Sequence, residues 1–245
     1  MSDVLDRAFA FMARGDMAGT DFEETEFGTA VQSYEAPLRQ DSNYLLVEST
    51  GADASQLAGA VQALGLQVVV VKDEANGTRL ADEFAALTWH IHRHVVMVHR
   101  RPPSKDVTTE VATEVDEAVL REFRRSGILS EPWGSPELAD QIIRSKQLLA
   151  ERLTARFFAV LDGGRPVAAT ELYLDPPEAQ VEDVATLESH RNRGYASALV
   201  AHAVVQARAA GATFVFLVAR ADDWPHKLYE RLGFETAGFY YKFFI

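Results

Sequence analysis

The residues most suited to chemistry lie in one short segment, Glu188-Ser189-His190-Arg191-Asn192-Arg193-Gly194-Tyr195-Ala196, between an expected strand and an expected helix. A glycine followed by small residues at such a junction lets a phosphate approach backbone N–H groups closely. The N-terminus of the helix adds a partial positive charge. Arg191 and Arg193 supply charge-assisted donors to the same anion. The segment therefore predicts a phosphate site, although a solvated basic patch at an ordinary junction fits the same residues.

This segment differs from two common phosphate-binding loops. No Gly-Lys-Ser/Thr follows the glycine, so it is not a P-loop, and the three-glycine dinucleotide fingerprint is missing. A second pattern, Leu228-Tyr229-Glu230-Arg231-Leu232-Gly233-Phe234, lies downstream within a short expected helix. It follows an expected buried strand at 214–218. The two patterns in this order are therefore compatible with fewer protein families than either pattern alone.

Together, Arg191-x-x-Gly194-x-Ala196 and Leu228-Tyr229-x-x-x-Gly233-Phe234 resemble the acyl-CoA motif and the tyrosine segment of the GNAT superfamily of N-acetyltransferases. Their order, their spacing and the intervening strand agree with that family over residues 107–245. The resemblance implies an α+β GNAT fold, with a mixed central sheet flanked by helices. It also implies acetyl-CoA as co-substrate and an N-acetyltransferase activity.

The resemblance further implies where the cofactor binds. The backbone of residues 184–186 would pair with the pantetheine arm, and amides of residues 191–196 would hold the pyrophosphate. Two adjacent parallel strands, those containing Thr186 and Phe216, would separate so that the thioester lies in the gap. The predicted cofactor-binding residues are Val184, Ala185, Thr186, Arg191, Asn192, Arg193, Gly194, Tyr195, Ala196 and Ser197.

Proton transfer needs two further groups. By the resemblance, Tyr229 is the general acid for the departing thiolate, an effect worth about 10²–10⁴ in rate. The attacking amine must lose a proton, and the candidate bases are Glu182 and Asp183, with Glu171 on the preceding strand behind them. Because adjacent strand residues point to opposite faces, only one of Glu182 and Asp183 is expected to face the cleft, and Glu182 is preferred. Proton transfer to water alone is the alternative.

Three features depart from the family pattern. Asp222 and Asp223 stand where an asparagine often precedes the tyrosine helix, and Glu188 replaces the usual proline after the fourth strand. Ala196 replaces the second glycine of the acyl-CoA motif. The first two departures bear on the pantetheine contacts and on product handling, and none of the three alters the expected fold.

The elements that must position these residues follow from hydrophobic periodicity and turn signals. In the C-terminal part we expect strands at 107–111, 156–161, 166–174, 181–187 and 214–218, and helices at 116–125, 136–153, 195–210 and 224–232. Asp162-Gly163-Gly164 between two apolar runs predicts a hairpin. The aromatic run at 239–244 is expected to be a final strand.

The N-terminal part repeats the order strand, helix, strand, helix, strand. The expected strands are 44–47, 67–71 and 89–99, and the expected helices are 53–64 and 79–87. We therefore predict two GNAT-like halves in tandem, a degenerate domain at 1–103 and an acetyltransferase domain at 104–245, separated near Pro102-Pro103. The junction at 48–53 lacks the arginine–glycine pattern, so the N-terminal half is expected to bind no CoA. A short amphipathic helix begins the chain, and the acidic stretch 16–26 is expected to be a second breakpoint.

Composition limits the functional class. The chain has 245 residues, of which 47% are hydrophobic, with a net charge of −12 and no cysteine. The composition is that of a globular protein, and the missing cysteines exclude disulfides, thiolate metal sites and a cysteine nucleophile. The acidic charge disfavours nucleic acid and anionic membranes and mildly favours cationic ligands such as amines. The N-terminus lacks the features of a signal peptide, so a cytoplasmic location is expected.

These inferences predict direct acetyl transfer to a primary amine on a small molecule or peptide, without a covalent enzyme intermediate. The alternative is a non-catalytic acyl-CoA-binding regulatory module, which would share every cofactor residue. A homodimer is one assembly left open.

His90, His92 and His94 alternate on one expected strand face and could bind zinc. No cysteine or carboxylate lies near them, so no metal is expected.

Overall fold

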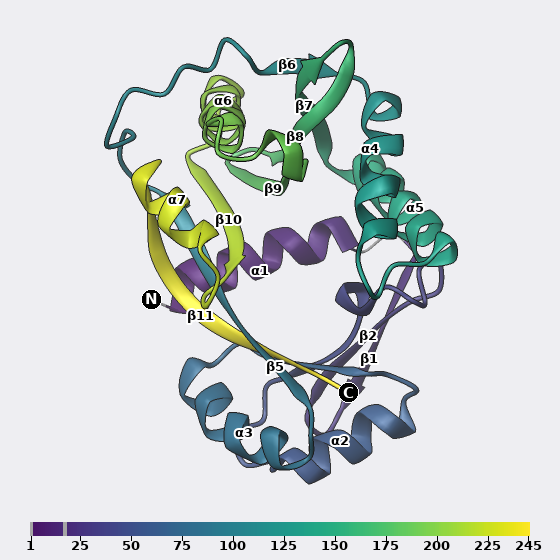
Figure 1. The fold of residues 1–245 in the computed structure, drawn as a ribbon. Coiled ribbons are helices and arrows are strands. Elements are labelled where there is room, and N and C mark those ends of the chain that lie inside the picture. Colours follow the sequence, from purple (N-terminus) through teal and green to yellow (C-terminus); the bar gives the residue numbers. More distant parts are fainter. Residues whose placement is uncertain (1, 17–18) are drawn as a thin grey trace. The chain divides into compact units, whose positions relative to one another are not determined.

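The computed structural model describes residues 2–16 and 19–245, which form two compact units (Figure 1). The first unit extends to Val95 and also contains Ala219–Asp223 and Ala237–Ile245. The second unit contains Val96–Val218 and Trp224–Thr236. Three strands, β5 (His90–His99), β10 (Phe214–Arg220) and β11 (Phe234–Phe244), contribute residues to both units. The contacts between residues therefore do not divide the chain into two domains at residue 103, and the division at that residue remains a prediction.

The second unit is a mixed sheet flanked by helices, as the expected α+β GNAT fold requires. Neighbouring strands follow the order β10-β9-β8-β7-β6; β9 is parallel to β10, and β6 to β9 pair antiparallel. The remaining elements of this unit, in chain order, are β6 (Thr113–Val115), α4 (Glu117–Ser130), α5 (Pro136–Arg152), β7 (Thr154–Asp162), β8 (Arg165–Asp175), β9 (Glu178–Thr186), α6 (Tyr195–Ala209) and α7 (Pro225–Arg231).

Helices α4 and α6 cover opposite faces of this sheet. Phe157 of β7 packs in an apolar cluster with Leu120 of α4 and Ala169 of β8. The next residue, Phe158, instead contacts the ring of His202 on α6, with centroids 4.9 Å apart. Because consecutive strand residues alternate between faces, this pair assigns the α4 face to Phe157 and the α6 face to Phe158.

The predicted hairpin joins β7 to β8. Gly163 and Gly164 have φ values of 57° and 80°, a region that glycine enters without steric cost. Two successive positive φ values are typical of the turn whose twist matches that of the flanking strands. The hairpin prediction from Asp-Gly-Gly is confirmed.

The first unit repeats much of this element order. Three antiparallel strands, β1-β2-β3, are followed by β4, which is parallel to β3 and antiparallel to the end of β11. Its elements before β5 are α1 (Ser2–Asp16), β1 (Thr20–Thr25), β2 (Gly28–Ser33), β3 (Asn43–Val47), α2 (Ala54–Ala63), β4 (Val68–Val71) and α3 (Glu74–Ala86). The core includes all four valines of β4 and a stacked ring pair, Phe84 and Phe243.

Three sequence predictions about elements are wrong in detail. The strand expected at 107–111 is irregular, and β6 forms at Thr113–Val115, where β7 supplies a pairing partner. The acidic stretch at 16–26 contains all of β1 instead of a breakpoint; residues 17 and 18 lie outside the described part. Helix α3 begins at Glu74 rather than near residue 79, because the Asp73 carboxylate accepts the Asn76 N–H at 2.7 Å and caps it.

Within residues 2–16 and 19–245, no helix is long and apolar enough to cross a membrane. Over the same residues, no group of His, Asp and Glu side chains is arranged to hold a metal ion. The row of histidines on β5 is explained by packing: His94 stacks on Tyr240 with centroids 4.9 Å apart, and His92 lies against Phe244.

His94 is a half-buried neutral group of the first unit. Burial, reinforced by the nearby Lys242 ammonium and partly opposed by Asp41, lowers the pKa of the His94 imidazole to about 3. Its Nδ1 is buried and has no hydrogen-bond partner in the described structure. Protonation would place a second cation beside Lys242, and His92 and Arg220 add to that repulsion.

This geometry predicts acid-sensitive stability. Because the pKa of His94 is lower in the fold than the unfolded value of about 6.5, the unfolded chain binds more protons between the two values. The stabilisation is complete above pH ~6.5 and declines as the pH falls toward the folded pKa. His94→Gln should therefore flatten the free energy of unfolding between pH ~6.5 and ~4, measured by denaturant titration. A slope equal to that of the parent protein would contradict this prediction.

Candidate active site

Strands β9 and β10 separate after a short parallel pairing. Their ladder contains three pairs, from Phe214↔Glu178 to Phe216↔Gln180. Strand β9 continues to Thr186, and at its end the ladder partners lie on β8, with Ala168↔Thr186 and Ala169↔Ala185. The separation predicted for the strands containing Thr186 and Phe216 is therefore present in the described pairing. It gives the last β9 residues an edge at which an extended ligand could make backbone hydrogen bonds.

Strand β9 contains a bulge where the separation begins. The β8–β9 register shifts between Ala169 and Glu171, so that two β9 residues oppose Thr170 alone. Asp183, the first of these two, has φ +51°. The Thr170 hydroxyl donates to the carbonyl of Glu182 at 3.0 Å, next to this irregular position. The bulge changes the direction of β9 before residues 184–186.

The bulge corrects the expectation that Glu182 and Asp183 point to opposite faces. Glu182 stands directly opposite Glu171 in the ladder, so the two side chains share a face. The Lys146 ammonium on α5 lies 2.9 Å from Glu171 Oε2 and 2.6 Å from Asp183 Oδ2. Glu182 and Asp183 therefore both lie on the side of the sheet covered by α4 and α5. The extra residue of the bulge interrupts the usual alternation of side chains along β9.

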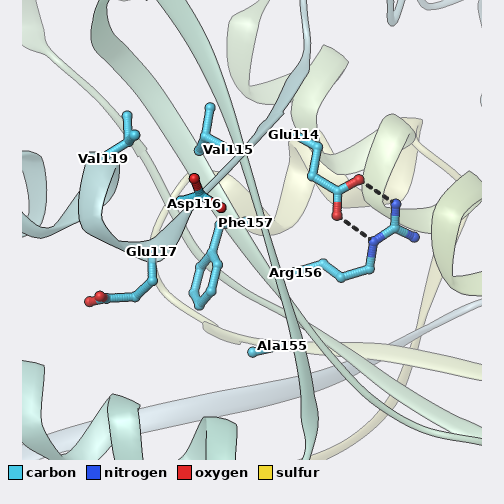
Figure 2. A pocket seen from close by; sticks show the side chains of 8 residues that line it. All are labelled: Glu114, Val115, Asp116, Glu117, Val119, Ala155, Arg156 and Phe157. Atoms are coloured by element: carbon cyan, nitrogen blue, oxygen red, sulfur yellow. Dashed lines mark hydrogen bonds and ion pairs between the residues drawn. The ribbon is translucent and has the colours of Figure 1, made fainter.

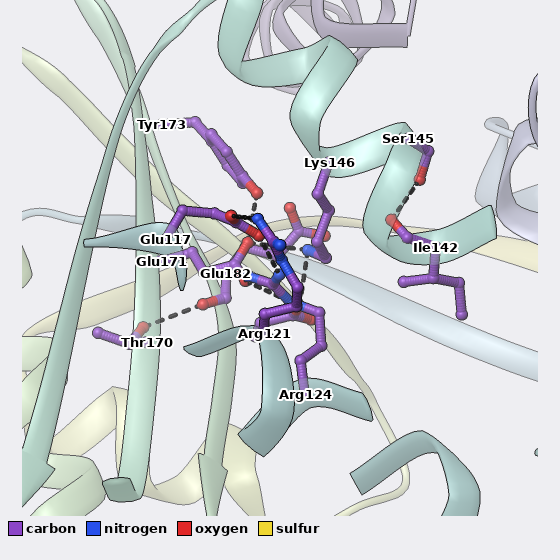
Figure 3. Close-up of polar contacts among 11 residues, drawn as sticks. Glu117, Arg121, Arg124, Ile142, Ser145, Lys146, Thr170, Glu171, Tyr173 and Glu182 are labelled. Carbon is purple, nitrogen blue, oxygen red and sulfur yellow. Dashed lines mark hydrogen bonds and ion pairs between the residues drawn. The ribbon is translucent and has the colours of Figure 1, made fainter. Parts of the chain in front are cut away.

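A buried charge network lies under this bulge (Figure 3). Glu171 Oε1 accepts from Arg124 of α4, and Oε2 accepts from the Lys146 ammonium and from the Tyr173 hydroxyl. The side chains of Glu171, Lys146 and Arg124 are 3%, 6% and 8% exposed. Arg124 also contacts Glu117 at 3.3 Å. Because both Glu171 oxygens are engaged by cations inside the fold, Glu171 is poorly placed to act as the base.

Protonation in this network follows from its charges. Burial favours a neutral Lys146, but the Asp183 and Glu171 carboxylates outweigh it and raise the pKa of Lys146 well above its usual value. Burial raises the pKa of the Tyr173 phenol as well, although the Lys146 cation opposes that shift. Lys146 is therefore a cation and Tyr173 a hydroxyl donor at neutral pH.

The predicted phosphate loop leads directly into α6. Asn192 and Gly194 have φ values of 63° and 80°, so the backbone turns twice before the helix begins at Tyr195. Arg193 is tied back to the carbonyl of Ser189 at 3.2 Å, and Arg191 Nε lies 3.4 Å from the carbonyl of Thr186. Residues 191–194 are exposed. A side chain built at Gly194 would meet no atom within 4 Å, which shows open space in front of the turn.

The first turn of α6 is suited to an anion. Gly194 is the N-cap and has no side chain, so no side-chain cap occupies the first amides of the helix. Tyr195, Ala196 and Ser197 provide these amides and are partly buried. Free amides and the positive end of the helix dipole together bind phosphate groups in many proteins. The geometry fits the predicted diphosphate cradle, whose assignment to CoA remains a prediction.

The second motif builds a tight corner after α7. Gly233 has φ +94°, and a Cβ there would lie 1.8 Å from the Arg101 carbonyl oxygen, so the backbone contact requires glycine. Tyr229 is 8% exposed, and its ring centroid lies 6.2 Å from that of Phe234. These contacts account for the glycine and the aromatic residues of the motif. The catalytic role of the Tyr229 hydroxyl remains a prediction.

A pocket of about 510 Å³ lies away from this cleft, between the first turn of α4 and the β6–β7 edge of the sheet (Figure 2). Its acids include Glu114, Asp116 and Glu117. Arg156 forms two hydrogen bonds with Glu114, at 2.8 and 2.6 Å. The pocket is on the far side of β8 from the β9–β10 separation, because β6 and β7 lie at the opposite end of the strand order. We therefore do not include it in the candidate site.

The comparison with protein families agrees with this geometry. Residues 118–234 match the model of the "Acetyltransferase (GNAT) family". This region is a GNAT acetyltransferase domain. It includes the β9 bulge, the loop before α6 and Tyr229. A segment of 72 residues is also 35% identical to the "Uncharacterized N-acetyltransferase CgeE" of Bacillus subtilis (strain 168), and this match covers 29% of the chain and 28% of that relative.

Solved structures support the fold over most of the chain. A functionally unknown conserved protein from Staphylococcus epidermidis ATCC 12228 has a TM-score of 0.66 at 15% identity, covering 92% of this chain and 94% of that chain. A GCN5-related N-acetyltransferase from Kribbella flavida has a TM-score of 0.62 at 19% identity, covering 97% and 94%. At these identities the likeness concerns the fold alone.

Sequence reasoning missed the charged partners of the GNAT domain's bulge. Lys146 follows Ala139 and Ile143 at helical spacing, on the buried stripe of α5, and its side chain is buried. Arg124 lies four residues from both Leu120 and Ile128, on the buried stripe of α4. The available signal was a glutamate, Glu171, inside an apolar strand, since a buried acid usually requires a cationic partner. Sequence alone did not say which helix would supply it.

The network predicts a large difference between two equivalent substitutions. Glu171→Gln would leave buried Arg124 and Lys146 with too little negative charge and should lower the free energy of unfolding by about 3 kcal/mol or more. Glu114→Gln removes an exposed partner of Arg156 and should cost about 1 kcal/mol or less. Denaturant unfolding of both variants measures the difference. Equal losses would contradict the buried network.

Proposed function

We propose that the GNAT domain transfers the acetyl group of acetyl-CoA directly to a primary amine. The observation that carries this proposal is the separation of β9 from β10, followed at once by the open loop at the N-terminus of α6. One feature suits an extended chain and the other suits a diphosphate. Coenzyme A carries both, joined in that order.

Binding of the cofactor would use mainly the backbone. Val184, the second residue of the bulge, and Ala185 and Thr186, which follow it, would form hydrogen bonds with the amides of pantetheine. Amides of residues 191–197 would receive the diphosphate, with Arg191 and Arg193 near the same anion. A thioester held along β9 would then lie near the bulge, where Glu182 stands.

The chemistry requires two proton movements. The neutral amine nitrogen attacks the thioester carbonyl, a C–N bond forms and the C–S bond breaks. Glu182 accepts the amine proton directly or through water, and Tyr229 protonates the departing thiolate. We prefer Glu182 to Asp183 as the base because the Asp183 carboxylate lies 2.6 Å from the Lys146 ammonium. No covalent enzyme intermediate is needed.

We also propose that the N-terminal half is a degenerate GNAT-like repeat. Its order β1-β2-β3-α2-β4-α3-β5 parallels β7-β8-β9-α6-β10-α7-β11. At the start of α2, where α6 has Gly194, stands Asp53, whose carboxylate accepts the Gln56 N–H at 2.8 Å. The Asp53 carboxylate occupies amides that a phosphate would need, and its negative charge would repel a phosphate. This contact supports the proposal that the half binds no CoA.

The acceptor in this proposal is a small-molecule or peptide amine. The net charge of −12 favours a cationic acceptor over nucleic acid or an anionic membrane surface. The same composition, together with the lack of cysteine, supports a cytoplasmic setting. A mass-spectrometric screen of amines with acetyl-CoA would identify the acceptor by the gain of one acetyl group.

Two glycines at opposite ends of α6 provide a matched test of the cofactor site. Gly194→Glu places a carboxylate in front of the first helical amides and should abolish saturable acetyl-CoA binding in calorimetry. Gly211→Glu is the control, because Gly211 also has a positive φ, 91°, and open space around it. It should bind like the parent protein. Parent-like binding by Gly194→Glu would show that the site is misplaced.

Tyr229 distinguishes an enzyme from a regulatory acyl-CoA-binding module. Tyr229→Phe should leave acetyl-CoA affinity within about twofold and slow turnover roughly 10²-fold, because it removes only the proposed acid. Tyr241→Phe, which removes a hydroxyl 3.1 Å from Thr78 Oγ1 in the first unit, is the control and should turn over normally. An unchanged rate in Tyr229→Phe would remove the proposed role of this tyrosine.

A further inference from the structure

Lys146 joins two strands at the bulge, although it belongs to neither. Its ammonium, on the buried face of α5, contacts Glu171 of β8 and Asp183 of β9 at 2.9 and 2.6 Å. The Lys146 side chain is 6% exposed, whereas that of Asp183 is 44% exposed. The contact thus connects the buried network to a partly exposed residue of the β9 bulge.

The energetics explain why this contact is specific. A buried ammonium costs several kcal/mol of desolvation unless carboxylates compensate it, and here two carboxylates share it. Asp183 in turn adopts a positive φ, which costs a non-glycine residue about 1 kcal/mol or more unless surrounding contacts fix it. Each group therefore stabilises the other: Lys146 holds Asp183 in its strained conformation, and Asp183 helps to compensate the buried charge.

The position of this contact within β9 gives it a functional consequence. Asp183 lies between Glu182, the proposed base, and Val184, the first residue proposed to pair with pantetheine. The Thr170 hydroxyl donates at 3.0 Å to the Glu182 carbonyl, which belongs to the peptide group that joins Glu182 to Asp183. A change in the backbone at Asp183 would therefore move the base and the pantetheine edge relative to each other. Misplacement of reacting groups by about 1 Å can cost 10²-fold in rate.

We propose that Lys146 is a positioning residue for acetyl transfer: its ammonium holds Asp183, and with it the β9 bulge that orients Glu182 and residues 184–186. Lys146 touches neither substrate nor cofactor in this role. The inference rests on the proposed function. It adds that α5, which contributes no residue to the cofactor site, controls the geometry of that site through one ionic contact.

The test uses the full chain and compares variants at both ends of the contact. Asp183→Asn removes the charge that Lys146 holds, at a partly exposed residue, so the variant should fold. It should lower kcat for acetyl transfer at least tenfold and reduce the free energy of unfolding less than Glu171→Gln does, because Glu171 still compensates the Lys146 charge. Asp140→Asn, which removes a more exposed carboxylate of α5 paired with Arg125, is the control and should keep the parent kcat.

Variants of Lys146 add a measurement, the pH profile, that would not change if Lys146 only contributed packing. The Lys146 cation favours ionised Glu182. Lys146→Met should therefore shift the acidic limb of the pH profile of kcat/KM upward. Lys146→Arg keeps the charge and should restore the parent pH profile. If Lys146→Met does not fold, Lys146→Arg and Asp183→Asn still decide the question.

The outcomes separate this inference from the proposed function. A parent protein that neither binds acetyl-CoA nor acetylates any amine overturns the proposed function, and this inference with it. A parent that transfers acetyl while Asp183→Asn has the parent kcat overturns this inference alone. A parent-like pH profile in folded Lys146→Met also overturns it. A low kcat in Asp183→Asn, together with the shifted profile that Lys146→Arg restores, supports it.

Discussion

The ladder between β9 and β10 ends after Gln180 and Phe216, and the candidate site depends on that short pairing. A parallel sheet normally satisfies its backbone groups strand by strand, so a strand that leaves its neighbour must find other partners. Ala185 and Thr186 keep β8 on one side and turn the other toward the gap. A bound chain with amides of its own can complete the pairing there. The loop that follows turns at Gly194 and presents helical amides to whatever lies beyond the gap.

A buried charge network lies on the face of β9 that α4 and α5 cover. Glu171, with Arg124 and Lys146, forms an ionic layer between the sheet and helices α4 and α5, in a place where most domains of this size have only apolar side chains. Such a layer contributes little net stability compared with a well-packed apolar one, but it requires one arrangement of its partners. Because Asp183 is one of those partners, the arrangement extends to the bulge.

The sequence predicted local features well and long-range ones poorly. Helix α5 begins where Ser135 and Pro136 signal it, and the anion loop around Gly194 is a local turn, so both could be predicted. Strand β1 was missed because its residues are mostly exposed and lack an apolar alternation. The faces of Glu182 and Asp183 were mispredicted because a bulge depends on register with β8, which no spacing within β9 encodes. The partnership of Lys146 with two strands has the same long-range origin.

The structure of the protein with coenzyme A bound tests the central claim most directly. The account predicts the diphosphate within hydrogen-bond distance of amides between Arg191 and Ser197, with pantetheine alongside residues 184–186 and the sulfur near the bulge of β9. A nucleotide end bound elsewhere, for example against the first unit at Asp53, would contradict it.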